Sequence, residues 1–84
     1  MREQFIHPSA CIDGSASLGE GCRVGAMAVI ESGAKVGAGA EIGPKVYIGR
    51  NVCIGCGAVV GCGAVLMDDT ILGNRAVVEA AHYR

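Results

Sequence analysis

The chain is poor in aromatic and charged residues, and it lacks several kinds of segment. Aromatic side chains make up 4% of the 84 residues and there is no tryptophan, so a core built around large rings is excluded. No apolar run approaches the ~18 residues of a membrane-spanning helix, and no basic run is present, so we expect no membrane span and no nucleic-acid partner. The opening MREQFIHPSA lacks the apolar stretch of a secretory signal.

The cysteines are odd in number: Cys11, Cys22, Cys53, Cys56 and Cys62. An odd count without a secretory signal favours reduced thiols and a cytoplasmic protein. Cys53 and Cys56 form one C-x-x-C pair, but the second pair and the nearby histidine of a typical zinc site are missing. We therefore predict no metal site and interpret the pair as small residues that the chain tolerates there, with zinc binding as the alternative.

A six-residue repeat runs through the chain. Every sixth residue is aliphatic: Ile6, Ile12, Leu18, Val24, Ile30, Val36, Ile42, Ile48, Ile54, Val60, Leu66, Leu72 and Val78. A small residue usually stands two places before each of them, and Gly usually follows directly, as in Gly37. Gly or Asn recurs three places after the aliphatic residue, as in Gly39 and Asn51.

This spacing predicts short strands joined by tight corners. An aliphatic and a small residue two places apart lie on the same side of a strand, and Gly or Asn supplies the positive φ that a corner needs. A helix is excluded, because a period of six drifts around a 3.6-residue turn. We predict an all-β protein, a single-stranded parallel β-helix of about 4.5 triangular coils with three six-residue sides each. We expect residues 1–84 to form one domain, with caps at about 1–5 and 80–84.

The repeat resembles that of the hexapeptide-repeat acyltransferase-like superfamily over nearly the whole chain. That resemblance implies a left-handed β-helix; the spacing does not set handedness, and parallel crossovers are normally right-handed. The phrases IHPSA at 6–10, GCGAVLMD at 61–68 and DDTILGN at 68–74 are similar to stretches of the lipid A N-acyltransferases, the sugar acetyltransferases and the γ-carbonic-anhydrase-like proteins. These branches share the phrases, so the phrases do not choose among them.

The resemblance implies acyl or acetyl transfer from acyl-CoA, the co-substrate, to a sugar or amine acceptor at a trimer interface. The family's transferases use an outward-facing histidine as general base. His82, in an Ala-His dipeptide, is our candidate catalytic residue, and a frayed chain end is the alternative; we interpret His7 as a turn residue. A non-catalytic oligomerisation or assembly module is a second hypothesis. A γ-carbonic-anhydrase-like metal protein is a third, although that site needs three histidines.

Residues directly before the aliphatic ones point outward, and those 18 apart stack on one wall. The uncharged wall consists of Cys11, Val29, Tyr47, Val65 and Tyr83. Exposed apolar patches often mark contacts, and tyrosine is enriched in them. We therefore predict a homotrimer that associates through this wall; the alternative is that valine simply suits a strand.

The spacing of 18 also brings charged residues together. It places Arg23 beside Glu41, and Arg50 beside Asp68, where we expect exposed pairs worth about 0–1 kcal/mol each. Asp13 and Glu31 stack as like charges at one corner. That arrangement is either a mild cost or a cation site.

Overall fold

The computed structural model describes residues 4–79, which contain thirteen two-residue strands and no helix. The strands are β1 (Phe5–Ile6), β2 (Cys11–Ile12), β3 (Ser17–Leu18), β4 (Arg23–Val24), β5 (Val29–Ile30), β6 (Lys35–Val36), β7 (Glu41–Ile42), β8 (Tyr47–Ile48), β9 (Cys53–Ile54), β10 (Val59–Val60), β11 (Val65–Leu66), β12 (Ile71–Leu72) and β13 (Val77–Val78). The predicted six-residue spacing is therefore kept throughout this part of the chain. Among the described residues there is no helix long and apolar enough to cross a membrane.

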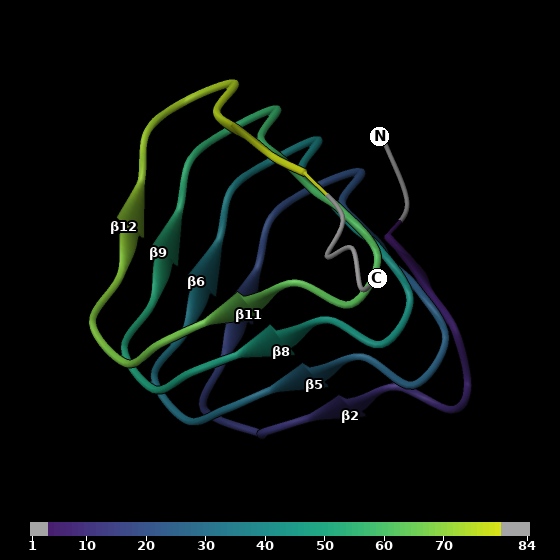
Figure 1. The fold of residues 1–84 in the computed structure, drawn as a ribbon. Coiled ribbons are helices and arrows are strands. Elements are labelled where there is room, and N and C mark those ends of the chain that lie inside the picture. The colour runs from purple at the N-terminus through teal and green to yellow at the C-terminus, as the bar shows by residue number, and fades with distance from the viewer. Residues whose placement is uncertain (1–3, 80–84) are drawn as a thin grey trace, which may run out of the picture.

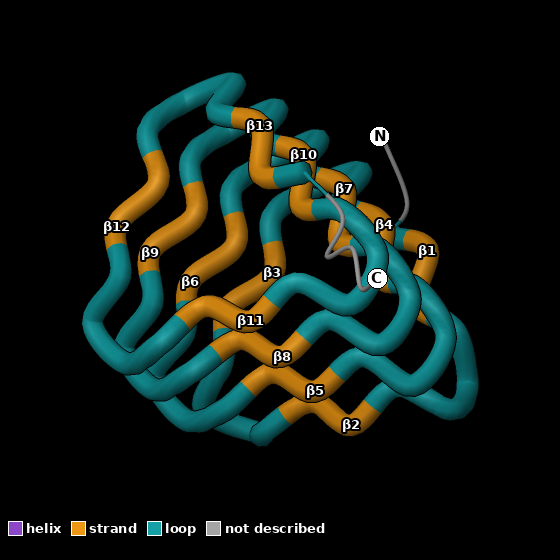
Figure 2. The backbone as a smooth tube through the Cα atoms, in the orientation of Figure 1, coloured by secondary structure: helices purple, strands orange, loops and turns teal. Residues whose placement is uncertain are grey.

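The strands form three parallel sheets, one on each side of a triangular coil (Figure 1). Sheet A has the order β1-β4-β7-β10-β13, sheet B the order β11-β8-β5-β2, and sheet C the order β12-β9-β6-β3. Each strand pairs with the one 18 residues away, as Tyr47 does with Val29. Figure 2 shows the sheets as three stacks of short strands joined by corners. The predicted all-β parallel β-helix is confirmed, with just over four coils.

The core is a column of aliphatic and small side chains that fills the triangle. Ile30 and Ile48 are at most 1% exposed, and Ala28 and Ala34 are fully buried. Burying one such isoleucine contributes about 1.5–3 kcal/mol. The end coils are less covered, since Ile6 is 37% exposed. Away from the end coils, the positions that the repeat assigned to the interior are therefore the ones that the structure buries.

The corners are tight turns that carry a residue with positive φ. The Ala40 N–H donates to the Gly37 carbonyl oxygen at 3.2 Å, and Gly39, the third residue of this turn, has a φ of 71°, which is typical of a type II turn. The predicted role of Gly and Asn at this third place is confirmed. Four further residues take the same conformation without being glycine or asparagine: Met27, Lys45, Asp69 and Arg75.

Glycines directly after the aliphatic residues have a different role from the one we predicted. None of the described ones has a positive φ, so the expectation that they supply it is wrong at this place. A Cβ on Gly25 would lie 2.6 Å from the backbone nitrogen of Pro44 in the next coil. Glycine at this place therefore lets the next coil approach closely, whereas nothing lies within 4 Å of a Cβ on Gly73 in the last described coil.

Candidate functional site

His82, the predicted catalytic residue, lies outside the described residues, as do Tyr83 of the uncharged wall and the predicted cap at 80–84. Two outer faces of the described coil have the concave shape of a binding surface. One runs along sheet A, and the other lies on sheet B.

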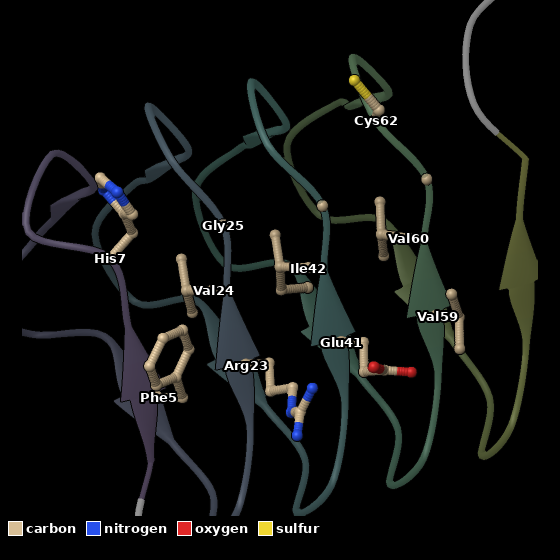
Figure 3. Close-up of a pocket in the computed structure, with 12 residues that line it drawn as sticks. Phe5, His7, Arg23, Val24, Gly25, Glu41, Ile42, Val59, Val60 and Cys62 are labelled. Atoms are coloured by element: carbon tan, nitrogen blue, oxygen red, sulfur yellow. The ribbon is translucent and has the colours of Figure 1, made fainter.

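The sheet A groove is an open hollow of about 370 Å³ across β1, β4, β7 and β10. Its outward-facing side chains come from one column of paired residues: Phe5, Arg23, Glu41 and Val59. Figure 3 shows this column, with His7 and Cys62 at the corner beside it. Between its apolar ends lie one cation, Arg23, and one anion, Glu41, so the groove suits a ligand that has both apolar and polar parts.

Arg23 and Glu41 supply the charge in the sheet A groove. They are exposed and lie in register on adjacent strands, as predicted, but they form no ion pair. Within residues 4–79 the single ion pair joins Arg50 Nε and Asp68 Oδ2 at 3.8 Å, and the Arg50 N–H also donates to Asp68 Oδ1 at 2.8 Å. The Arg23 guanidinium is therefore available to an anion such as a phosphate, whose geometry it matches.

His7 is held in the corner at the edge of the groove. The Ser9 N–H donates to His7 Nδ1 at 3.1 Å, and Ser9 Oγ lies 2.8 Å from the same nitrogen. Because a backbone N–H can only donate, Nδ1 is the unprotonated nitrogen, and the proton of the neutral ring is assigned to Nε2. Nε2 in that tautomer is a donor, so the geometry fits the turn role that we predicted for His7 rather than that of a general base.

In the next corner, the carboxylate of Asp13 takes the place that the His7 ring has in the first. Asp13 Oδ1 accepts hydrogen bonds from the N–H and the hydroxyl of Ser15, at 2.9 and 2.7 Å. These hydrogen bonds, the backbone one first, hold the pKa of Asp13 below its ordinary value. The sequence contained this signal, in the matching triplets His-Pro-Ser and Asp-Gly-Ser six residues apart, but we did not use it.

The uncharged wall follows sheet B. Cys11, Val29, Tyr47 and Val65 lie in register on its four strands, and an open hollow lies over β2 and β5. The Tyr47 hydroxyl donates to Glu31 Oε2 at 3.2 Å. Burial, and then the hydrogen bond to Glu31 and its charge, raise the pKa of Tyr47. The described part of the wall is therefore apolar with an acidic group at its border.

Metal binding finds no support in the described geometry. Among residues 4–79, no three His, Cys, Asp or Glu side chains are close enough together to hold an ion. Asp13 and Glu31 bond to different partners, Ser15 and Tyr47. All five cysteines are free thiols. The described residues thus offer no ligand set for a γ-carbonic-anhydrase-like centre.

A parallel coil of unbroken six-residue sides, with aliphatic residues inside and grooves outside, defines a hexapeptide-repeat β-helix protein. More narrowly, the chain belongs to the family described as the GMPPB C-terminal domain, whose model matches residues 27–81. No curated protein matches the sequence.

Two solved structures have a similar coil. PerB from Caulobacter crescentus, solved with CoA and GDP-perosamine, matches with a TM-score of 0.71 and 22% identity over 95% of this chain. A UDP-N-acetylglucosamine acyltransferase from Arabidopsis matches with a TM-score of 0.60 and 33% identity over 88% of this chain. The chain spans 52% and 29% of those two proteins. The predicted resemblance to acyltransferase-like hexapeptide-repeat proteins is confirmed at the level of the fold.

Proposed function

We propose that the chain is the repeat core of an acyl-CoA-dependent transferase that acylates an amine or hydroxyl group of a nucleotide-linked sugar. The observation that carries the proposal is the 33% identity to a UDP-N-acetylglucosamine acyltransferase over 88% of this chain. PerB, solved with CoA and a nucleotide sugar, has the same coil. Both proteins are much longer than this chain, so the reaction is a proposal about what the shared coil does.

The proposed reaction needs one general base. The acceptor nitrogen or oxygen attacks the thioester carbonyl, a new amide or ester bond forms, and the carbon–sulfur bond breaks. The base takes the acceptor's proton, and the CoA thiolate leaves and is protonated. We assign the base to His82, because His7 Nδ1 already accepts a hydrogen bond from the backbone N–H of Ser9.

The sheet A groove is the proposed binding surface for the phosphates of a substrate. Arg23 is its exposed cation, and Phe5 and Val59 at either end give it apolar contacts. A guanidinium binds phosphate in a two-pronged geometry. An Arg23→Gln variant should therefore raise the KM for acyl-CoA or for the nucleotide sugar more than it lowers kcat.

Copies of the chain associate, in this proposal, as a homotrimer through the uncharged wall. The four described members of that wall support it, because they carry no charge on the four adjacent strands of sheet B. We also infer a cytoplasmic protein, which the five free thiols support.

A thiol-release assay with acetyl-CoA and a panel of nucleotide amino sugars and nucleotide sugars tests the proposal. Acceptor-dependent release of CoA is expected, with loss of most of the rate in His82→Ala and retention of kcat in His7→Ala. Equal rates in His82→Ala and the parent protein would contradict the assignment of the base. No release by a folded oligomer, with every acceptor, would contradict acyl transfer itself.

A non-catalytic assembly module is the second candidate, and the unbroken coil favours it. From β1 to β13 no loop projects from the six-residue spacing within the described residues. Defined oligomers without acyl transfer and without CoA binding in equilibrium dialysis would support the module over the enzyme.

A further inference from the structure

We propose that Glu41 makes the sheet A groove selective for nucleotide sugars that carry a free amino group. The ligand lies along the coil axis, with its base against Phe5, its phosphates at Arg23 and its ammonium group at Glu41. This selectivity rests on the proposed acyl transfer and deepens it, because it chooses between the amine and the hydroxyl acceptors that the reaction allows. Glu41 selects the acceptor on binding and is not the general base.

The groove presents its outward side chains in a fixed order. Phe5 pairs with Arg23, and Arg23 pairs with Glu41, on adjacent parallel strands. Val59 follows Glu41 one strand further along the axis. Successive strands are about 4.8 Å apart, so an extended ligand meets an aromatic ring, then a cation, then an anion and then an apolar side chain. A base, its phosphates and an aminated sugar follow one another in the same order, and any base can stack on an aromatic ring.

Arg23 and Glu41 act in the groove as two separate charges. Both are exposed, and neither takes part in an ion pair within residues 4–79, although they lie in register on adjacent strands. In Figure 3 the carboxylate of Glu41 lies on the side of Val59, away from Arg23. Each charge is therefore available to a different group of one ligand.

The groove has room for a sugar ring beside Glu41. Three glycines, Gly25, Gly43 and Gly61, line it in successive coils. They carry no side chain, so a ring can lie against the backbone there while its amino group reaches the carboxylate of Glu41.

The charge of Glu41 distinguishes among ligands that contain phosphates. It repels the phosphates that Arg23 attracts, and so lowers the affinity for any ligand whose charge is only negative. Acyl-CoA and nucleotide sugars without an amine have no cation that offsets this repulsion. An ammonium group offsets it through a charge-assisted hydrogen bond, which is roughly twice as strong as a neutral one. A nucleotide amino sugar is therefore the occupant whose charges complement both residues.

Isothermal titration calorimetry without acyl-CoA tests this selectivity apart from catalysis. The probes are UDP-glucosamine and UDP-glucose, which differ in carrying an amino or a hydroxyl group at one carbon. The parent chain should bind UDP-glucosamine about ten-fold more tightly, which is about 1.4 kcal/mol. Glu41→Gln should weaken the binding of UDP-glucosamine and strengthen that of UDP-glucose, so that the two affinities agree within about three-fold.

Two further variants separate this role from a general loss of structure or of charge. Arg23→Gln should weaken both ligands by a similar factor, about ten-fold, and leave the ratio of their affinities unchanged, because both carry phosphates. Glu20→Gln is the matched control, because Glu20 is an exposed glutamate at the corner after β3, outside the groove. That variant removes the same charge and should leave both affinities unchanged.

Equal affinities of the parent chain for the two probes, no saturable binding of either probe, or an unchanged ratio in Glu41→Gln would each overturn the proposed selectivity. Release of CoA with amine and hydroxyl acceptors alike would in that case leave acyl transfer standing. Selective binding of UDP-glucosamine without release of CoA would instead support the role of Glu41 and contradict acyl transfer.

Discussion

Gly37 lies directly against Cys56 of the next coil: a Cβ on Gly37 would stand 2.5 Å from the Cys56 backbone nitrogen and 2.6 Å from the Gly55 carbonyl carbon. Both contacts are with backbone, so no side chain can rotate away to relieve them. Glycine directly after the aliphatic residue therefore lets the coils stack this closely, and three glycines at this place, Gly25, Gly43 and Gly61, line the sheet A groove.

Gly37→Ala should lower the free energy of unfolding by about 2–3 kcal/mol, because the coils must separate to admit the methyl group. Gly73→Ala is the matched control: it holds the same place in the repeat, but nothing lies within 4 Å of its Cβ position. That variant should be neutral or slightly stabilised. Denaturant unfolding at one fixed protein concentration measures the stability of both variants. Equal losses of unfolding free energy in Gly37→Ala and Gly73→Ala would refute the role of Gly37 in coil stacking.

Shortening a buried side chain and shortening an exposed one in the same kind of strand should lower the free energy of unfolding by very different amounts. Ile48 is fully buried and Ile71 is 77% exposed. Ile48→Ala should lower the free energy of unfolding by about 2–5 kcal/mol, because burial is lost and a cavity is left behind. Ile71→Ala should change it by no more than about 0.5 kcal/mol. Similar midpoints for the two variants in a urea titration would contradict the interior that the structure assigns.

The interior was predictable from the sequence because one period of six describes both the strand and its corner. Ile48 faces inward and Tyr47 outward for that reason alone. Handedness was not in the spacing and came from the family resemblance. The need for glycine at position 37 could not be foreseen, because it depends on the distance from Gly37 to Cys56 in another coil. The positive φ of Met27 was missed, because it is set by the place of Met27 in the turn and not by its residue type.

The carboxyl of Asp13 should titrate below its ordinary pKa of 3.8, because two hydrogen bonds from Ser15 favour the charged form. Its contribution to stability is therefore present above that value and is lost as the pH falls through the lower, folded-state pKa. Ser15→Ala removes the hydroxyl bond and should raise the pKa of Asp13, as followed by NMR of the carboxyl carbon. Ser17→Ala is the control, and an equal shift there would contradict the assignment.

Tyr47 should titrate above its ordinary pKa of 10.0, mainly because of burial and then because of Glu31. Any contribution of this raised pKa to the free energy of unfolding is present below pH 10.0 and is lost as the pH rises through the folded-state pKa of Tyr47. Glu31→Gln should lower the pKa of Tyr47 yet leave it above 10.0, since burial remains. Ultraviolet titration in a Tyr83→Phe background isolates this phenol, and an unchanged pKa would show that Glu31 does not act on it.

Much less of the candidate site could be predicted. The uncharged wall followed from the spacing of 18 and is confirmed for Cys11, Val29, Tyr47 and Val65. The sheet A groove was missed, because the spacing of 18 placed Arg23 beside Glu41 but did not show that the surface there is hollow. A groove depends on the shape between side chains, which spacing alone does not contain.

Acyl transfer by this chain is tested most directly by following the acyl group itself. The chain is incubated with acetyl-CoA that carries an isotope-labelled acetyl group and with a nucleotide amino sugar, and the products are resolved by mass spectrometry. We predict labelled acetyl on the sugar and an equal amount of free CoA. Labelled acetyl-CoA that stays intact with every acceptor, or that loses its label to water at the same rate without an acceptor, would contradict it.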